Sequence, residues 1–227
     1  MRTEQSRLYA IVDAEVLAAR GIPLEDIAEG LRAAGVRLIQ YRDKTGSPQQ
    51  TLHAATVLES AFWRKKKPGA AQVAKLPDAG HPSVLLIMND RADLAVLADF
   101  DGVHVGQGDL SPEDARKVVG EGPMVGVSTH TDEQVRAAEW SCADYVAIGP
   151  VFATGTKADT EPVVGLEGVR RARALTTKPL VAIGGITRAN ARSVIDAGAD
   201  SVAVISALLV EGESVEKVAR DFLEILR

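Results

Sequence analysis

Basic side chains follow several of the apolar runs in this sequence, at the places where strands would end. Arg42 and Lys44 come directly after one such run, and Lys157 stands in the long segment after another. Cations that arrive from separate strands can surround a group of high negative charge, and Arg binds phosphate through two parallel hydrogen bonds. These three residues therefore predict a pocket for a phosphate or diphosphate group.

Two carboxylates stand in equivalent places at the ends of neighbouring strands. Asp90 follows the third apolar run and Asp109 follows the fourth. Mg²⁺ is bound in proteins through one or two carboxylates together with water and substrate phosphate oxygens, so the pair predicts a magnesium site. A single acid at a strand end is more often a helix cap or an ion-pair partner, and we expect that structural role for Asp43 and Asp93.

A second anion site is indicated further along the chain. Gly184 and Gly185 precede an expected helix start at Thr187, and Ser206 follows the last apolar run. In barrels of alternating strands and helices, the loops after strands seven and eight commonly hold a phosphate, and glycine lets backbone N–H groups approach it. A Gly-Gly pair alone occurs in many loops, so this prediction depends on the position of the pair.

The sequence does not decide the roles of the histidines. His104 lies inside an apolar run and is expected to be a packed, hydrogen-bonded core histidine, whereas His130 follows the fifth run, where a catalytic acid or base and a helix cap are equally compatible with its position. No Cys–His pair, Ser–His–Asp set, metal-binding cluster or dinucleotide fingerprint is visible. Two anion sites and a divalent metal without a nucleophile suit departure of a pyrophosphate group, because positioning and charge neutralisation carry such a reaction.

Eight short apolar runs must position these residues. Each is apolar nearly throughout, which is typical of strands buried on both faces, and helix-period segments with capping residues separate them. Strict alternation of this kind predicts an α/β fold, a single-domain (β/α)8 TIM barrel over residues 1–227. An open doubly wound sheet is the alternative, but the first run lacks the glycine-rich turn of such folds. The runs cover residues 8–12, 37–41, 84–88, 102–105, 124–127, 145–148, 180–183 and 202–205.

One segment interrupts the alternation. Residues 62–83 are rich in Lys, Ala, Pro and Gly. A connection of this length is unusual between a helix and a strand, so we predict an insertion there without a catalytic role. Its basic run at residues 64–67 is expected to be a solvated face, and contact with an anionic partner is left open.

Composition excludes several classes of protein. The chain has 227 residues, 46% of them hydrophobic, and its 26 Lys and Arg against 31 Asp and Glu give a net charge of −5. Global disorder and a basic surface for nucleic acid are thereby excluded. The apolar stretches are too short to cross a bilayer and no secretory signal is visible, so we expect a cytoplasmic protein without a membrane or nucleic-acid partner. The single cysteine, Cys142, cannot form an internal disulfide. The sequence neither indicates nor excludes a homo-oligomer.

Six sequence motifs overlap or follow the apolar runs in order. They are QYRDK at 40–44, MNDRADLA at 88–95, DGVHVGQGDL at 101–110, GVSTH at 126–130, GPVFATGTK at 149–157 and VAIGGI at 181–186. Together these motifs resemble those of the thiamine phosphate synthase family. The resemblance runs from about Leu8 to the C-terminus, with the interruption at 62–83, and Asp43 stands where Glu is common in the family.

The resemblance implies a (β/α)8 barrel that joins hydroxymethylpyrimidine diphosphate to thiazole phosphate and releases pyrophosphate. By this resemblance, Mg²⁺ is the cofactor, with Asp90 and Asp109 as its ligands. The pyrimidine diphosphate is expected to bind Gln40, Arg42, Lys44, Asn89, Ser128 and Lys157. The catalytic residues among these are Arg42, Lys44, Ser128 and Lys157. The thiazole phosphate is expected to bind Thr154, Thr156, Gly185, Ile205 and Ser206.

The mechanism that the resemblance implies is dissociative, with pyrophosphate leaving before the thiazole nitrogen attacks the pyrimidine methyl cation. Two alternatives are kept. A thiazole tautomerase of the same superfamily would keep Gly185 and Ser206, use His130, and have no need for the diphosphate-binding residues. A non-catalytic relative that binds thiamine phosphate would show a degraded metal or cation site, and none is visible.

Overall fold

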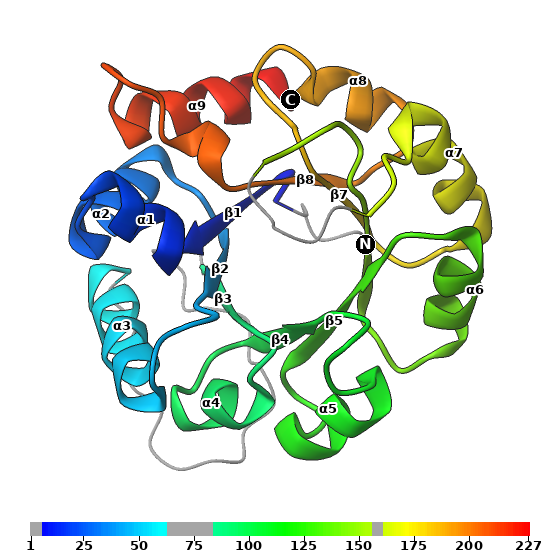
Figure 1. The fold of residues 1–227 in the computed structure, drawn as a ribbon, viewed down its shortest axis with the longest axis horizontal. Coiled ribbons are helices and arrows are strands. Elements are labelled where there is room, and N and C mark those ends of the chain that lie inside the picture. The colour runs from blue at the N-terminus through cyan, green and yellow to red at the C-terminus, as the bar shows by residue number, and fades with distance from the viewer. Residues whose placement is uncertain (1–5, 63–83, 156–160) are drawn as a thin grey trace, which may run out of the picture.

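The strands of the protein pair in chain order and in one direction until the sheet closes on itself (Figure 1). The structure is a computed structural model, and it describes residues 6–62, 84–155 and 161–227. Each strand is parallel to the next, and the last returns to the first with Leu8 opposite Val202 and Tyr9 opposite Ala203. The predicted (β/α)8 barrel is therefore confirmed.

Burial on both faces explains why the strand sequences are apolar nearly throughout. β1, β4, β6 and β8 are buried at every position. The predicted runs agree with the observed strands to within about two residues at either end, the precision usual for such boundaries. The strands are β1 (Leu8–Asp13), β2 (Leu38–Arg42), β3 (Leu85–Asn89), β4 (Gly102–Val105), β5 (Met124–Thr129), β6 (Tyr145–Ile148), β7 (Leu180–Ile183) and β8 (Ser201–Val204).

Helices surround the barrel on its outside (Figure 1). The alternation is less strict than predicted, because two helices follow β1 and a short 3-10 helix, η1, precedes the last α-helix. The helices are α1 (Ala14–Arg20), α2 (Leu24–Ala34), α3 (Pro48–Ala61), α4 (Ala92–Leu97), α5 (Pro112–Val119), α6 (Asp132–Trp140), α7 (Gly165–Leu175), α8 (Ala191–Asp196), η1 (Ser206–Leu208) and α9 (Val215–Ile225).

Capping residues set where the helices begin. Ser111 caps α5 by accepting a first-turn backbone N–H at 3.1 Å, and Pro112 occupies the first helical position. One predicted start is wrong, because α8 begins at Ala191 and not at Thr187. The residues between them form a turn in which the Asn190 side chain accepts the Thr187 N–H at 2.7 Å.

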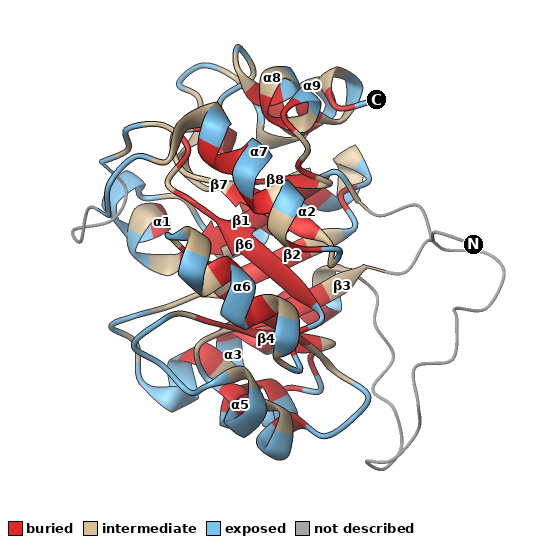
Figure 2. Ribbon diagram, turned by 90° about the vertical axis from the view of Figure 1, so that its right-hand side faces the viewer, coloured by how far each residue is buried: buried red, intermediate tan, exposed pale blue. Residues whose placement is uncertain are grey.

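Buried residues lie along the strands, whereas the helices carry both buried and exposed residues (Figure 2). The buried side chains of the sheet belong to two separate cores. Leu8 and Ala10 of β1 pack in the cluster that joins the strands to the buried faces of the helices. Tyr9 and Ile11 of the same strand belong to a second cluster, which also contains Tyr145 of β6 and fills the barrel interior. Because successive side chains of a strand point to opposite faces, one strand sequence serves both cores.

Three acids join neighbouring strands at the end of the barrel where the strands begin. Asp101, Asp144 and Asp200 stand immediately before β4, β6 and β8, and each accepts a backbone N–H of the preceding strand at 2.7 to 2.8 Å. Asp144 also forms an ion pair with Arg116, and Asp200 forms one with Arg173. These contacts join the strands at the end of the barrel where they begin, away from the end where the candidate site residues follow the strands.

The predicted insertion lies between α3, which ends at Ala61, and β3, which begins at Leu85. Its residues 63–83 lie outside the described residues, so only Phe62 is placed, as the C-cap residue that follows α3. Within the described ranges, no helix has the length and apolar character needed to cross a membrane.

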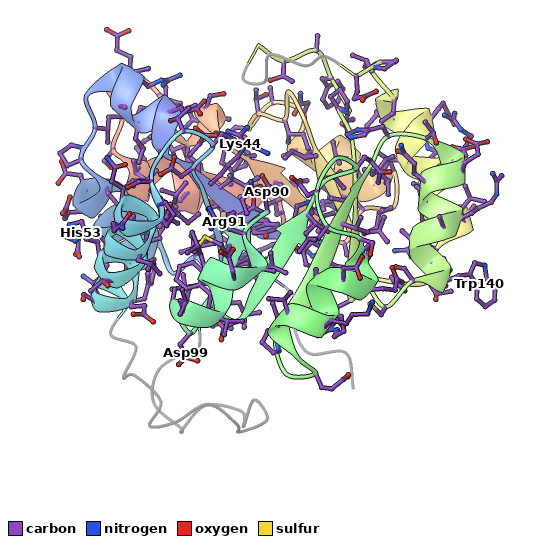
Figure 3. All side chains as sticks on the ribbon, turned by 60° about the horizontal axis from the view of Figure 1, so that its bottom comes forward. Lys44, His53, Asp90, Arg91, Asp99 and Trp140 are labelled. Atoms are coloured by element: carbon purple, nitrogen blue, oxygen red, sulfur yellow. The ribbon has the colours of Figure 1, made fainter. Side chains whose placement is uncertain are left out.

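Two aromatic residues test the contribution of the outer core. Phe222 of α9 is fully buried, whereas Trp140 at the end of α6 is 90% exposed and projects away from the barrel (Figure 3). We expect Phe222→Ala to lower the free energy of unfolding by about 3–5 kcal/mol, since it leaves a cavity, and Trp140→Ala to change it by less than about 0.5 kcal/mol. Urea unfolding followed by circular dichroism measures both values. Equal losses in the two variants would contradict the packing described here.

Candidate active site

Arg42 is held in place by a buried acid. Arg42 ends β2, and its guanidinium forms an ion pair with Asp13, which ends β1 directly opposite it. Asp13 is 2% exposed and also caps α1 by accepting the Val16 N–H at 3.0 Å. A carboxylate with these two partners fixes the orientation of the guanidinium at the carboxyl end of the barrel.

Lys44, Asp90 and Asp109 form a second charged group beside it. Lys44 follows β2 and forms an ion pair with Asp90, which follows β3 (Figure 3). Asp90 has a left-handed backbone with φ of 60°, and its N–H donates to the carbonyl of His104 at 2.7 Å. Non-glycine residues rarely adopt this conformation, although Asp tolerates it better than most, and Asp99 adopts it as well. The turn brings the Asp90 carboxyl to that of Asp109.

The Asp90 and Asp109 carboxyl groups shift each other's pKa in opposite directions. Burial raises the pKa of Asp90, Lys44 partly offsets this effect, and the hydrogen bond to Asp109 adds to it. Burial acts in the same direction on Asp109, but hydrogen bonds from Asp90 and from the Gly106 N–H leave the pKa of Asp109 below its ordinary value. Of the two carboxyl groups, Asp90 therefore takes up a proton more readily than Asp109. The described residues contain no group of three or more His, Cys, Asp or Glu that could hold a metal, so a cation bound here would need water or substrate ligands as well.

Asn89 brings a buried donor without a partner to the same place. Its Nδ2 is the one buried side-chain nitrogen or oxygen in the described ranges that makes no hydrogen bond. A buried polar group left in this state costs about 1–3 kcal/mol. Because Asn89 ends β3 immediately before Asp90, a ligand beside the charged groups is well placed to satisfy this donor.

The ends of β5 to β8 surround a cavity of about 340 Å³ at the same mouth of the barrel. Arg20 of α1 also reaches this cavity and adds a cation that the sequence did not indicate. Thr156 and Lys157, which were predicted for this region, lie outside the described residues. The predicted site residues that line the cavity are Ser128, Thr154, Gly185, Ile205 and Ser206.

Glycine is required in the turn after β7 because the loop after β6 lies close to it. Gly184 and Gly185 have φ of 103° and 62°, and a Cβ on Gly185 would lie 2.6 Å from the carbonyl oxygen of Ala153 and 2.8 Å from Cβ of Phe152. Within the described residues, the N–H groups of both glycines make no backbone hydrogen bond. These donors therefore remain available to an anion in the cavity.

His130 reaches the cavity but does not cap a helix. Thr131 caps α6, and His130 precedes it. The ring Nδ1 of His130 lies 2.6 Å from the carbonyl oxygen of Gly149, so Nδ1 carries a proton and donates it. Of the two roles left open by the sequence, the helix cap is excluded, and a role in proton transfer stays a prediction.

His104 is buried, as predicted for a core histidine, but it also contacts the site. Its Nε2 lies 2.8 Å from Oγ of Ser128, and its Nδ1 lies 2.9 Å from the hydroxyl of Tyr145. The carbonyl of Ser128 accepts a hydrogen bond from the Gln107 side chain at 2.7 Å. Ser128 thus connects the β4 loop, which carries Asp109, with the cavity.

The interior tyrosines are site components that the sequence analysis did not identify. Gln40 of β2 donates its Nε2 hydrogen to the hydroxyl of Tyr9 at 2.9 Å, so this predicted site residue points into the barrel interior. A tyrosine in an otherwise aliphatic buried strand is the feature that could have found Tyr9 and Tyr145, because a buried hydroxyl needs a partner.

Asp43 and Asp93 have the structural roles expected for them. Asp43 accepts the Gly46 N–H at 2.7 Å, and Asp93 forms an ion pair with Arg91 at 2.6 Å. Neither acid is among the groups that contact Asp90 or line the cavity in the described structure.

Comparisons with known proteins agree on one family. Residues 8–208, which include every predicted site residue, match the family model of thiamine monophosphate synthase. The thiamine-phosphate synthase of Koribacter versatilis is 52% identical over 222 residues, which cover 97% of this chain and 95% of that protein. The thiamine-phosphate synthase of Chloroflexus aurantiacus is 39% identical over 214 residues, or 94% of this chain and 89% of that protein. The solved thiamine phosphate pyrophosphorylase from Pyrococcus furiosus has a TM-score of 0.80 and 30% identity and covers 98% of this chain and 96% of that one.

Gly185 is a sensitive point of the cavity. Gly35, which ends α2, also has a positive φ, of 82°, but a Cβ there would have no atom within 4 Å. We expect Gly185→Ala to weaken the binding of inorganic phosphate at least about tenfold, because the loop after β6 must move, and Gly35→Ala to leave it unchanged. Isothermal titration calorimetry measures both. Unchanged phosphate binding in Gly185→Ala would show that the turn after β7 is no part of an anion site.

Proposed function

The chain belongs to the thiamine monophosphate synthase family and is a transferase of thiamine biosynthesis, and we propose that each half of the carboxyl end of its barrel binds one of the two substrates. The charged half at the ends of β2 to β4 takes hydroxymethylpyrimidine diphosphate, and the cavity at the ends of β5 to β8 takes thiazole phosphate. The observation that carries this proposal is the place of Ser128, which lines the cavity and also contacts His104 of β4. The two substrates would meet there.

The charged half supplies what a diphosphate needs. Arg42 is oriented by Asp13, and Lys44 lies on the loop that follows the same strand. Among the described residues, Nδ2 of Asn89 is a buried donor without a partner. Guanidinium, ammonium and amide groups form strong hydrogen bonds to phosphate oxygens. Lys157 belongs to this set only through its motif, since it lies outside the described residues.

Mg²⁺ fits the Asp90 and Asp109 pair. Two carboxyl groups in contact are a favourable place for a cation, and Mg²⁺ commonly takes one or two protein carboxylates with substrate phosphate oxygens and water. When bound, the ion would neutralise charge on the departing pyrophosphate. Asp90 and Asp109 would hold it, and both must then be ionised.

The cavity suits the thiazole phosphate. The N–H groups of Gly184 and Gly185, which make no backbone hydrogen bond with the described residues, offer donors to the phosphate, and Thr154, Ile205 and Ser206 line the same cavity. Thr156 joins them in the proposal on its motif alone.

The chemistry needs positioning and charge neutralisation more than a protein nucleophile. Departure of pyrophosphate leaves a pyrimidine methyl cation, and attack by the thiazole nitrogen completes the new C–N bond. Arg42 and Lys44 would stabilise the leaving group, and the apolar Ile183, Ile186 and Ile205 in the cavity wall would keep water from the cation. A cytoplasmic location and the absence of nucleic-acid partners stay predictions from the sequence.

The reaction itself provides the first test. Purified protein mixed with the pyrimidine diphosphate, the thiazole phosphate and Mg²⁺ is expected to form thiamine phosphate and one equivalent of pyrophosphate, measured by chromatography and a coupled pyrophosphate assay. Removal of Mg²⁺ with EDTA should stop the reaction. Full-rate turnover after EDTA contradicts the metal role, and isomerisation of the thiazole without coupling favours the tautomerase.

Substitution of one carboxylate tests the metal site. Asp90→Asn keeps the shape of the side chain and removes its charge, so we expect kcat/KM to fall about 10²-fold or more, as for loss of a preorganised charge contact. Lys157→Ala should have an effect of similar size. Asp93→Asn is the matched control, because Asp93 pairs with Arg91 outside the site, and it should retain wild-type turnover. Near-normal turnover in Asp90→Asn would remove this residue from the metal site.

A further inference from the structure

Five side chains from five strands form one unbroken row of hydrogen bonds through the barrel interior. Nε2 of Gln40 donates to the hydroxyl of Tyr9 at 2.9 Å, and that hydroxyl lies 3.0 Å from the hydroxyl of Tyr145. The Tyr145 hydroxyl lies 2.9 Å from Nδ1 of His104, whose Nε2 lies 2.8 Å from Oγ of Ser128. The row therefore runs from one predicted substrate-binding residue to another.

The interior of the row is enclosed and tightly packed. Gln40, Tyr9, Tyr145 and His104 are all at most 7% exposed. The tyrosine rings meet edge to face with centroids 6.1 Å apart, and the Tyr145 ring occupies the space opened by Gly126, where a Cβ would lie 2.0 Å from it. These side chains have little room to exchange partners.

Both tyrosine hydroxyls must find an acceptor inside the row. Burial raises the pKa of Tyr9 and also that of Tyr145, so each keeps its proton at neutral pH. Within the described chain, the hydroxyl of Tyr9 contacts Gln40 and Tyr145, and the hydroxyl of Tyr145 contacts Tyr9 and His104. A buried hydroxyl proton without an acceptor is costly, so each proton goes to one of these neighbours.

The Gln40 amide then sets the direction of the whole row. With its N–H on Tyr9, the Tyr9 proton can go only to Tyr145, and the Tyr145 proton can go only to Nδ1 of His104. His104 must then carry its proton on Nε2 and donate it to Ser128. The hydroxyl of Ser128 accepts that bond and keeps its own proton for the cavity.

The opposite orientation of the amide would reverse every bond. If Oε1 of Gln40 accepted from Tyr9, Tyr145 would donate to Tyr9, Nδ1 of His104 would donate to Tyr145, and Ser128 would donate to Nε2 of His104. Ser128 would then offer only lone pairs to the cavity, which an anion repels. The orientation of one amide and the polarity of a distant hydroxyl are thus linked.

We propose that this row makes Ser128 an obligatory hydrogen-bond donor to the diphosphate and that Gln40 sets this polarity from the other end of the same substrate. In the structure, Oε1 of Gln40 makes no hydrogen bond with the described residues, so it can accept one from the ring amino group of the pyrimidine. A ring bound in this way locks Nε2 on Tyr9. Tyr9, Tyr145 and His104 are positioning residues in this scheme, and the inference rests on the proposed function for the identity of the substrate.

The tautomer of His104 in the wild-type protein is the direct test. Long-range ¹H–¹⁵N correlation spectra of the full chain, without substrate, report which ring nitrogen carries the proton, and His104→Gln identifies the signals. We expect a neutral ring protonated on Nε2. A His104 protonated on Nδ1 overturns the proposal, and this arm needs no substitution that threatens folding.

Gln40→Glu tests the link between the ends of the row. An ionised carboxylate can only accept, so the row should reverse, and His104 should move its proton from Nε2 to Nδ1. A ¹³C signal of the new carboxyl group identifies the pH at which it is ionised. Retention of the Nε2 proton once Glu is ionised, with or without a second proton on the ring, overturns the proposal.

The double variant Gln40→Glu/Tyr9→Phe is the matched control. It carries the same charge but lacks the hydroxyl that passes the reversal on, so His104 should keep its proton on Nε2. We also expect Gln40→Glu to bind magnesium pyrophosphate about tenfold more weakly than the double variant does, the loss of one hydrogen bond to a charged group. Equal affinities overturn the assigned role of Ser128.

The outcome is separable from that of the proposed function. A chain with the expected tautomers that forms no thiamine phosphate would refute the proposed function and leave the polarity of the row intact. A chain that forms thiamine phosphate with His104 protonated on Nδ1 would refute this inference alone.

Discussion

Closure of a parallel sheet is the constraint on which the rest of this structure depends. Because β8 pairs with β1 in the same direction as every other pair, all strands end on one rim, and residues far apart in the chain meet there. The opposite rim is fixed by Asp101, Asp144 and Asp200, which bind the N–H groups of neighbouring strands. The contacts of these three acids therefore lie at one end of the strands, and the candidate site residues lie at the other end.

The barrel interior combines packing with polarity. Apolar side chains such as Ile11 and Ile87 fill it, yet the row from Gln40 to Ser128 crosses it through buried hydroxyl and imidazole groups. Polar groups in such a place stabilise a unique arrangement only when each has a partner. In the arrangement that we propose, this condition ties the polarity of Ser128 to buried residues that lie outside the diphosphate site.

Much of the fold and part of the site could be predicted from the sequence. Apolar runs bounded by caps gave the strands, and the rule that barrel chemistry follows strand ends gave Arg42, Asp90 and Asp109. Tyr9 lies inside an apolar strand, where the strand-end rule does not apply, and Asp13 follows the first apolar run without a sequence sign of its ion pair with Arg42. The partners of both side chains depend on register and on cross-barrel distances, which no local pattern encodes.

The net charge of −5 is compatible with binding of two phosphorylated substrates, because several of the acidic side chains form ion pairs with cations close to them. Asp13 and Asp90 neighbour the very cations that face the mouth, while Asp144 and Asp200 are paired at the other rim. In physiological salt, exposed charges farther away than about 8 Å are largely screened. What a phosphate group meets is therefore the short-range field of oriented cations, glycine N–H groups and a hydroxyl of fixed polarity, and the balance of charge over the whole chain has little influence on it.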